Sequence, residues 1–73
     1  MARYYFNIKD GQTTLDTDGV ELADMDAVRK QAVIATGTML HDHGAEFWKD
    51  RDWQMWVTDE AGSTVCALRI SGE

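Results

Sequence analysis

The sequence predicts an α+β domain of order β-β-α-β-β, with a four-stranded, mostly antiparallel sheet and one long helix packed on one face. Three observations predict it. Segments in which apolar and polar residues alternate lie near both ends of the chain. Apolar residues recur at steps of three and four in the middle. The length of 73 residues leaves room for a single core, so we expect one domain over residues 1–73.

Two strands are expected before the helix. The first spans residues 3–8, where large apolar side chains occupy alternate positions. Asp10-Gly11 favours a hairpin turn, and a short second strand follows at residues 13–15. Asp18-Gly19 is a second turn signal, after which residues 20–22 lead into the helix.

The helix is expected to begin after Asp24, a good N-cap, and to stop at Gly44. Gly37, between two threonines, is a weak position inside it, and close packing of the helix on the sheet is the favoured explanation. The apolar stripe that defines the helix consists of Met25, Val28, Ala32, Ala35 and Met39.

Two more strands are expected after a polar connector at residues 45–52. They cover residues 53–58 and 64–70, and a turn at residues 59–62 joins them. On the last strand, alternation places Val65, Ala67 and Arg69 on the face opposite the core. The predicted core consists of Tyr4, Phe6, Ile8, Leu22, Val28, Ala32, Ala35, Met39, Trp53, Met55, Val57, Cys66, Leu68 and Ile70.

Composition excludes several classes of protein. The net charge is −6, and direct nucleic-acid binding needs concentrated positive charge. No apolar run approaches the ~18 residues of a membrane span, and no signal peptide is recognisable. The single cysteine, Cys66, cannot form an internal disulfide, so we expect a reducing, cytoplasmic location.

Three segments resemble a family of small bacterial proteins of unknown function. Residues 3–11 resemble its R-Y-[FY]-F-x-[IV]-x-D-G opening, and residues 16–24 its D-x-x-G-x-E-L-x-D stretch. Residues 53–62 resemble its W-x-[FM]-x-V-x-D-E-x-G hairpin. The resemblance covers nearly the whole chain and implies a stand-alone domain, but no activity. The sequence departs from the family at Trp56, where a polar residue is usual, and in the helix around Gly37.

An acidic run occupies residues 10–28, which contain no Lys or Arg. A calcium loop beginning at Asp16 would need Gly at its sixth position and Glu at its twelfth, and Glu21 and Ala27 stand there instead. Turn and cap chemistry explains several of these residues. The candidate acidic patch consists of Asp10, Asp16, Asp18, Glu21, Asp24 and Asp26.

His41, His43 and Cys66 are the only residues that suggest metal or thiol chemistry. Two histidines two positions apart on a helix point in divergent directions, and a zinc site needs three or four converging ligands. Solvated histidines near a helix end and a buried cysteine are the favoured interpretation. We therefore expect no enzyme activity, no cofactor and no metal, although a small enzyme using these residues is the third hypothesis.

Tyr5 and Trp56 fall on the strand face opposite the predicted core, together with Val65. Exposed aromatic residues are typical anchors of protein interfaces. The leading hypothesis is a non-enzymatic protein-interaction module that associates with itself, as a homodimer, through the uncovered sheet face that carries these residues or through a sheet edge. The alternative is an acidic inhibitor whose carboxylates occupy a basic nucleic-acid groove on a partner, as in small phage-encoded nuclease inhibitors.

Overall fold

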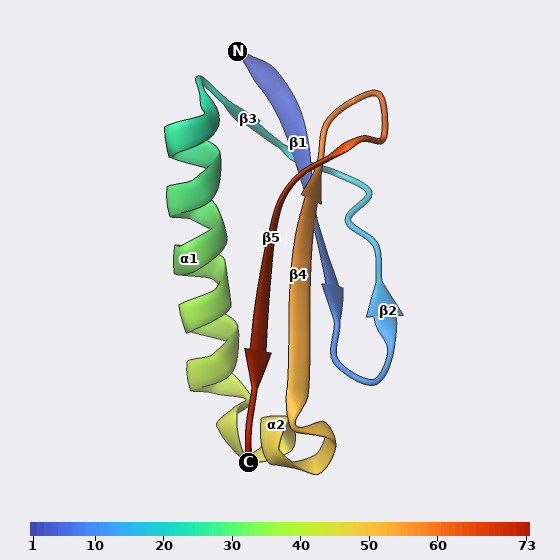
Figure 1. Cartoon of the computed structure of the whole chain (residues 1–73). Helices are drawn as coiled ribbons and strands as arrows, with labels where there is room; N and C mark the ends of the chain where they lie inside the picture. Colours follow the sequence, from blue (N-terminus) through green and yellow to red (C-terminus); the bar gives the residue numbers. More distant parts are fainter.

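A computed structural model describes residues 1–73 and confirms an α+β fold with an antiparallel sheet (Figure 1). It contains two helices and five strands, where one helix and four strands were expected. The elements are β1 (Ala2–Lys9), β2 (Thr13–Thr14), β3 (Val20–Leu22), α1 (Met25–Asp42), α2 (Gly44–Asp50), β4 (Asp52–Thr58) and β5 (Thr64–Ser71).

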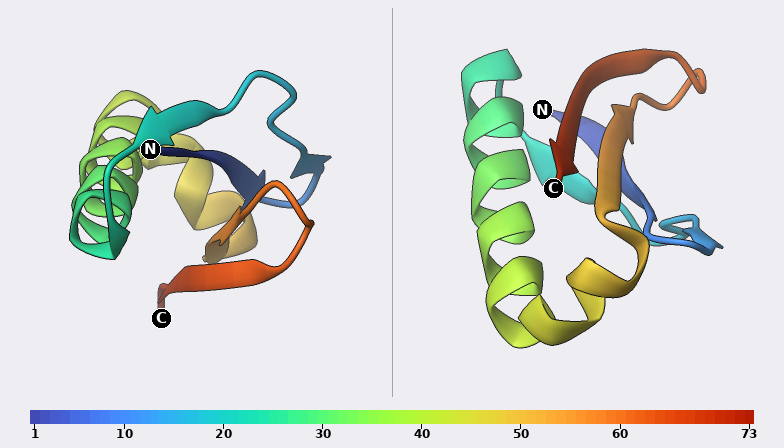
Figure 2. Two further views of the ribbon diagram at one scale, coloured as in Figure 1. Left: turned by 90° about the horizontal axis from the view of Figure 1, so that it is seen from above. Right: turned by 60° about the horizontal axis from the view of Figure 1, so that its bottom comes forward.

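The strand order is β2-β1-β4-β5, and every neighbouring pair is antiparallel. The added strand is β3, which pairs with residues 2–4 at the start of β1. Viewed along the strands, β1 lies between β3 and β4, while β5 lies at the opposite edge with no segment of the chain beyond it (Figure 2, left). The β5 edge is therefore open along its whole length.

The other edge of the sheet is interrupted. Thr14 of β2 pairs with Ile8, and Val20 of β3 pairs with Tyr4, so the connection at residues 15–19 is two residues longer than the stretch of β1 it spans. The extra residues cannot all enter the ladder. From sequence alone, residues 20–22 are expected only to lead into the helix, because three residues give too short a pattern to recognise as a strand.

Helix α1 covers one face of the sheet and builds the core. Asp24 caps it: the Asp24 carboxylate accepts a hydrogen bond of 2.8 Å from the Ala27 N–H. All the predicted core residues are buried or pack against the buried cluster. The fully enclosed members of that cluster are Val28, Ala32, Trp53, Met55 and Val57.

Two predictions about α1 and its surroundings are wrong. Gly37 does not mark close packing, since a Cβ atom there would have nothing within 4 Å. The residue that faces the sheet is its neighbour Thr36, which is buried and donates a 2.7 Å hydrogen bond to the Ala32 carbonyl. The hydroxyl is thereby satisfied inside the core, so an apolar stripe could not reveal it.

The predicted connector at residues 45–52 is instead helix α2 and the first residue of β4. Phe47 packs against the core, and its ring meets that of Trp48 edge-to-face at 5.4 Å. A Cβ atom at Gly72, just after β5, would lie 2.7 Å from Trp48. The short helix thus closes one end of the domain, and the mixture of charged and aromatic residues concealed its helical spacing.

Candidate interaction surfaces

The outer face is the sheet face opposite α1, and its β1 half is covered by the chain itself. Asn7 lies on this face but is only 4% exposed. Its side-chain Oδ1 accepts a 3.0 Å hydrogen bond from the Asp16 N–H. A Cβ atom at Gly19 would lie 2.9 Å from the Tyr5 ring. The connection between β2 and β3 therefore packs over this half, which the sequence analysis expected to be open.

Asp16 holds that connection in place. Its carboxylate accepts hydrogen bonds from the backbone N–H groups of Phe6, Asp18 and Gly19, at 3.1 to 3.2 Å. Partial burial raises the pKa of the Asp16 carboxyl, but the three donors outweigh it and hold the pKa below its ordinary value. The carboxylate is thus a structural anchor, which satisfies a β1 donor that the interrupted ladder leaves free.

The three predicted interface residues do not form one surface. Tyr5 lies under Gly19, as described above. Trp56 is half-buried on the outer face, between Asn7 of β1 and Ala67 of β5. Val65 is on the opposite side from the one expected, because it packs against the core cluster. The register of β4 and β5 shifts near Thr58, and this irregularity breaks the simple alternation that placed Val65 outside.

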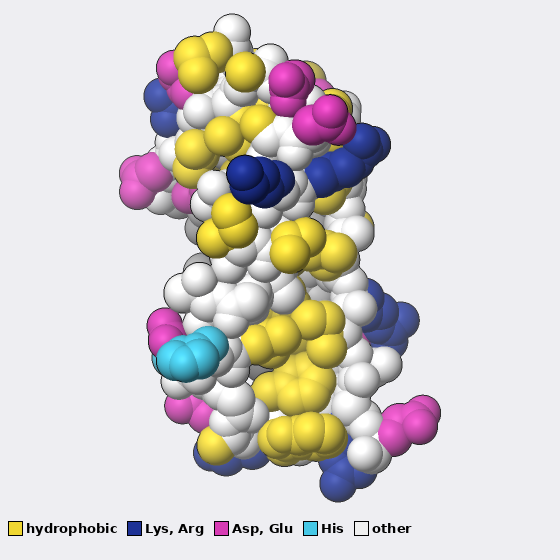
Figure 3. All heavy atoms as spheres, turned by 90° about the vertical axis from the view of Figure 1, so that its left-hand side faces the viewer, with side chains coloured by type: hydrophobic (Ala, Val, Ile, Leu, Met, Phe, Trp, Pro, Cys, Tyr) yellow, Lys and Arg dark blue, Asp and Glu magenta, His cyan; other side chains and the backbone are white.

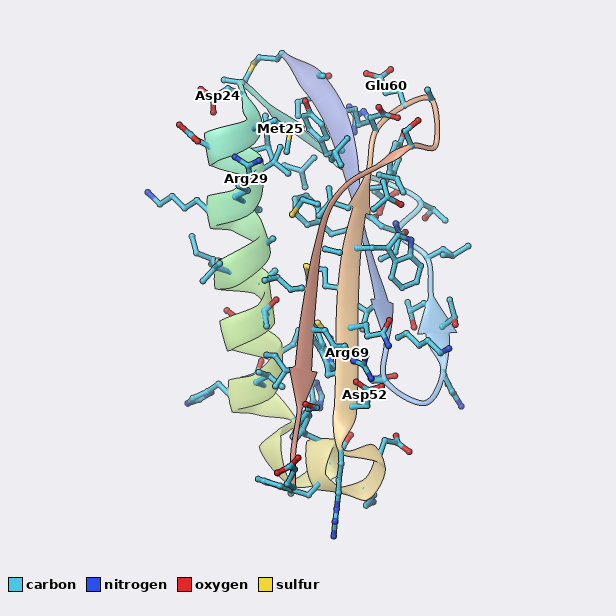
Figure 4. All side chains as sticks on the ribbon, viewed as in Figure 1. Asp24, Met25, Arg29, Asp52, Glu60 and Arg69 are labelled. Carbon is cyan, nitrogen blue, oxygen red and sulfur yellow. The ribbon has the colours of Figure 1, made fainter.

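The β4–β5 half of the outer face carries one ion pair. Arg69 Nε donates to the Asp52 carboxylate at 3.1 Å, and Figure 4 shows the two side chains meeting across the strands. The hydrogen bond from Arg69 holds the pKa of the Asp52 carboxyl below its ordinary value. This part of the face is therefore close to neutral, with Trp56 and Ala67 beside the pair.

The outer edge of β5 presents unpaired backbone groups. Gly72 N–H donates to the Arg51 carbonyl at 2.9 Å, which makes Arg51 and Gly72 a hydrogen-bonded pair in the β4–β5 register. Pairs of this type alternate along an antiparallel ladder. The residues between them therefore direct their N–H and C=O groups away from β4, and these residues are Ala67, Arg69 and Ser71.

A shallow apolar groove of about 330 Å³ runs between β5 and α1. Figure 3 shows apolar side chains gathered along this seam. Val33, 61% exposed, is an apolar side chain on its helical rim, and Arg29 is the only charged residue that lines it. The remaining lining residues are Ala32, Val65, Cys66, Ala67 and Leu68.

The predicted acidic patch is divided along the molecule. Asp10 lies in an open hollow of about 490 Å³ beside α2, where Asp50 and Asp52 also lie. Asp24 and Asp26 stand at the opposite end of α1 (Figure 4 labels Asp24). Glu21 pairs with Arg3 at 3.3 Å. Together with the structural use of Asp16, this leaves no continuous acidic surface over all six residues.

His41, His43 and Cys66 do not converge. Cys66 lines the groove beside Val33, whereas His41 lies eight residues further along α1, a rise of about 12 Å. The His41 and His43 rings face carboxylates of their own segment instead, Asp42 at 3.2 Å and Glu46 at 3.7 Å. No group of three or more His, Cys, Asp or Glu side chains is placed to hold a metal ion.

A sheet edge was an expected route to self-association, but the sequence did not identify β5 as that edge. One signal was available: residues 61–72 contain no carboxylate, and Arg69 is their only charged side chain. In an acidic chain, a segment of this length without Asp or Glu marks a surface where negative potential is low. The position of the segment at a sheet edge could not be read without the strand order.

Comparisons with known proteins identify the family. A family model described as a domain of unknown function (DUF6894) matches residues 3–71. No curated protein and no solved structure is detectably similar to the chain. Neither of the two helices is long and apolar enough to cross a membrane.

Proposed function

The chain belongs to the DUF6894 family, a domain of unknown function, and from its own surfaces we propose that it is a non-enzymatic protein-interaction module that associates with a second copy of itself. We place it in the cytoplasm, where Cys66, which has no partner for an internal disulfide, stays reduced.

The observation that carries the proposal is the open edge of β5. Sheet edges in soluble proteins are normally protected by short strands, bulges, proline or charged side chains. The β2–β3 edge has such protection, because its strands are short and interrupted. In contrast, β5 has eight residues, no proline, an irregularity only at its start near Val65, and a single charged side chain, Arg69, which is already paired with Asp52. An edge of this kind is competent to pair with another strand.

Trp56 supports the same surface. It lies next to Ala67, whose backbone faces the open edge, so a partner strand would come within reach of the indole ring. Aromatic residues beside a new interface often contribute more than 1 kcal/mol of its binding free energy. Of the predicted interface residues, Trp56 of β4 lies beside β5 on the outer face, and Val65 of β5 itself lines the groove on the other face. Tyr5 lies under Gly19.

Light scattering coupled to gel filtration, over a range of protein concentrations, tests the proposal. We expect a dimer whose dissociation constant rises by about tenfold in Trp56→Ala, because that substitution removes the aromatic anchor. Leu15→Ser is the matched control, since Leu15 is 62% exposed and belongs to the β2–β3 connection. A chain that remains monomeric at the highest concentration reached would overturn the proposal.

The alternative, an acidic inhibitor of a nucleic-acid-binding protein, has only the net charge of −6 in its favour. The division of the carboxylates between the two ends of the molecule argues against it. The two functions differ in their response to salt, because an acidic–basic complex weakens steeply as ionic strength rises.

A further inference from the structure

We propose that β5 pairs antiparallel with β5 of a second copy in one register, with Leu68 opposite Leu68 at the twofold axis. This inference rests on the proposed function and specifies its interface. The two sheets then become one continuous sheet, and the two α1 helices lie on the same face of it. A twofold axis makes such an interface self-complementary, since each copy offers the same strand to the other.

The backbone geometry limits the possible registers. Ala67, Arg69 and Ser71 direct their hydrogen-bonding groups outward, so these residues must form the hydrogen-bonded pairs with the second copy. A register with Arg69 opposite Arg69 would place like charges side by side, which is destabilising. In the Leu68-centred register, Ala67 lies directly opposite Arg69 of the second copy. The two Arg69 residues are then only diagonal neighbours, and each is paired with Asp52 of its own chain.

The same register joins the apolar surfaces on the helix side. Cys66, Leu68 and Ile70 share the face that α1 covers and are half-buried in the single chain. Pairing places Cys66 of one copy opposite Ile70 of the other, with the two Leu68 side chains between them. The row of half-exposed apolar residues thus becomes continuous across the axis, and water is excluded from the groove.

On the outer face, the register brings Arg69 near Trp56 of the second copy. In one copy, Gln54 of β4 lies beside Arg69 of β5. In the proposed dimer, Arg69 in turn lies beside Ala67 of the second copy, and that Ala67 lies beside Trp56 of the second copy. Ala67 is small, and strands two apart are separated by only ~10 Å. The Arg69 guanidinium stays paired with Asp52 of its own chain. Ala67 of the second copy therefore packs beside this ion pair, and the Trp56 indole of the second copy lies one strand further along the same face.

Electrostatics permit a second copy along this edge. Two chains of charge −6 repel each other over most of their surfaces. Between residues 61 and 72 there is no carboxylate, and Arg69 is neutralised by Asp52. Contact along β5 therefore adds little local repulsion between the two chains.

Disulfide trapping tests the register. In a Cys66→Ser background, Leu68→Cys places two thiols at a non-hydrogen-bonded pair on the twofold axis, where Cα atoms lie ~4.5 Å apart. We expect rapid formation of a disulfide-linked dimer with oxidised glutathione. Ala67→Cys in the same background is the control: its two Cα atoms would be more than ~7 Å apart, so it should not cross-link. Cross-linking of Ala67→Cys instead of Leu68→Cys would overturn the register.

A second pair of variants does not depend on the cysteines. Ala67→Pro removes an outward N–H without touching the β4 ladder, whereas Ala67→Val keeps it. We expect the proline to raise the dimer dissociation constant by at least about tenfold and the valine to leave it nearly unchanged. A dimer that tolerates the proline associates through another surface, which overturns this inference but leaves the proposed function standing. A chain that is monomeric throughout overturns both.

Discussion

Asp16 shows how one side chain can replace part of a strand. The interrupted ladder leaves backbone donors on β1 and in the connection, and the Asp16 carboxylate accepts three of them. Hydrogen bonds to a charged acceptor are stronger than those between neutral groups. In the sequence Asp16 is one member of an acidic run, because a half-buried carboxylate that accepts backbone hydrogen bonds cannot be told from a surface carboxylate by residue type.

Replacing Asp16 with asparagine should destabilise the fold. The amide nitrogen cannot accept the Phe6 N–H, so we expect the free energy of unfolding to fall by about 1–3 kcal/mol, measured by urea denaturation. Asp18→Asn is the control, because the Asp18 side chain is exposed and accepts no hydrogen bond in the structure. An equal loss in both variants would show that charge alone, and not the hydrogen bonds, is responsible.

Asp16 also predicts a pH dependence. The pKa of the Asp16 carboxyl is lower in the folded protein than in the unfolded chain. The ionised carboxylate therefore stabilises the fold fully when the pH is above the unfolded-state pKa, and this stabilisation is lost as the pH falls through the folded-state pKa. We therefore expect the stability of the native chain to decline as the pH is lowered from about 5 to about 3. The decline should be shallower in Asp16→Asn. Urea midpoints at several pH values measure it, and parallel slopes for the two proteins would contradict the assignment.

Gly37 is a second position where a substitution is informative. Since open space surrounds it in the middle of α1, Gly37→Ala should raise the free energy of unfolding by about 1 kcal/mol. Gly19→Ala should have the opposite effect, because Gly19 has φ +71° and its Cβ would collide with Arg3 and Tyr5. Thermal unfolding followed by circular dichroism compares them. Destabilisation by Gly37→Ala would mean that the helix needs the glycine for another reason.

At the scale of elements, β5 is defined by the contrast between its two sides. Its inner side is hydrogen-bonded to β4 along its length, and its outer side is free. Amide hydrogen exchange should resolve this contrast. In dilute solution, the amides of Cys66, Leu68 and Ile70 should exchange slowly, and those of Ala67, Arg69 and Ser71 quickly. At high concentration, the second group should become protected as well. Fast exchange of that group at every concentration would argue against pairing along this edge.

The longer elements could be predicted from the sequence because each has a strong local pattern. Strand β4 alternates cleanly from Trp53 to Val57, and α1 has both a cap and an apolar stripe. The short ones could not. Strand β3 exists because β1 offers it a partner, and α2 is fixed by the packing of Phe47 on the core. Such elements depend on tertiary contacts, which local patterns do not contain.

The candidate site was predicted only in its parts. Trp56 was placed correctly on the outer face. Which face of the sheet Val65 occupies depends on the irregularity near Thr58, and no residue type in the sequence indicates that irregularity. The closure of the β1 half depends on the path of residues 15–19, which follows from hydrogen bonds to Asn7 and Phe6. The β5 edge is open because β5 is the last strand in the sheet. The alternation of residues within a strand does not show which strands lie next to it.

At the scale of the whole molecule, the charge distribution bears on the proposed association. The domain is elongated, with extents of 37 by 19 by 18 Å, and carboxylates lie at both ends and along its flanks. No carboxylate lies between residues 61 and 72, so along β5 the barrier to the proposed association is general repulsion between two acidic bodies rather than a local clash.

This arrangement predicts that salt strengthens self-association. Raising the sodium chloride concentration from about 20 mM to about 200 mM shortens the Debye length from ~20 Å to ~7 Å and screens the repulsion between the two copies. We expect the dimer dissociation constant to fall, as measured by analytical ultracentrifugation. If the chain instead binds a basic partner through its carboxylates, that complex should weaken over the same range. A dimer that dissociates as salt is added would contradict the proposed interface.

The unequal edges of the sheet also set a limit on the size of any assembly. The margin formed by β2 and β3 is broken at Asp16, whose carboxylate already occupies the Phe6 N–H that an incoming strand would require. Once two copies have paired along β5, neither copy has a second continuous sheet edge to which a third copy could pair. Growth therefore terminates at a closed pair, and the break in the ladder protects the chain against fibre formation.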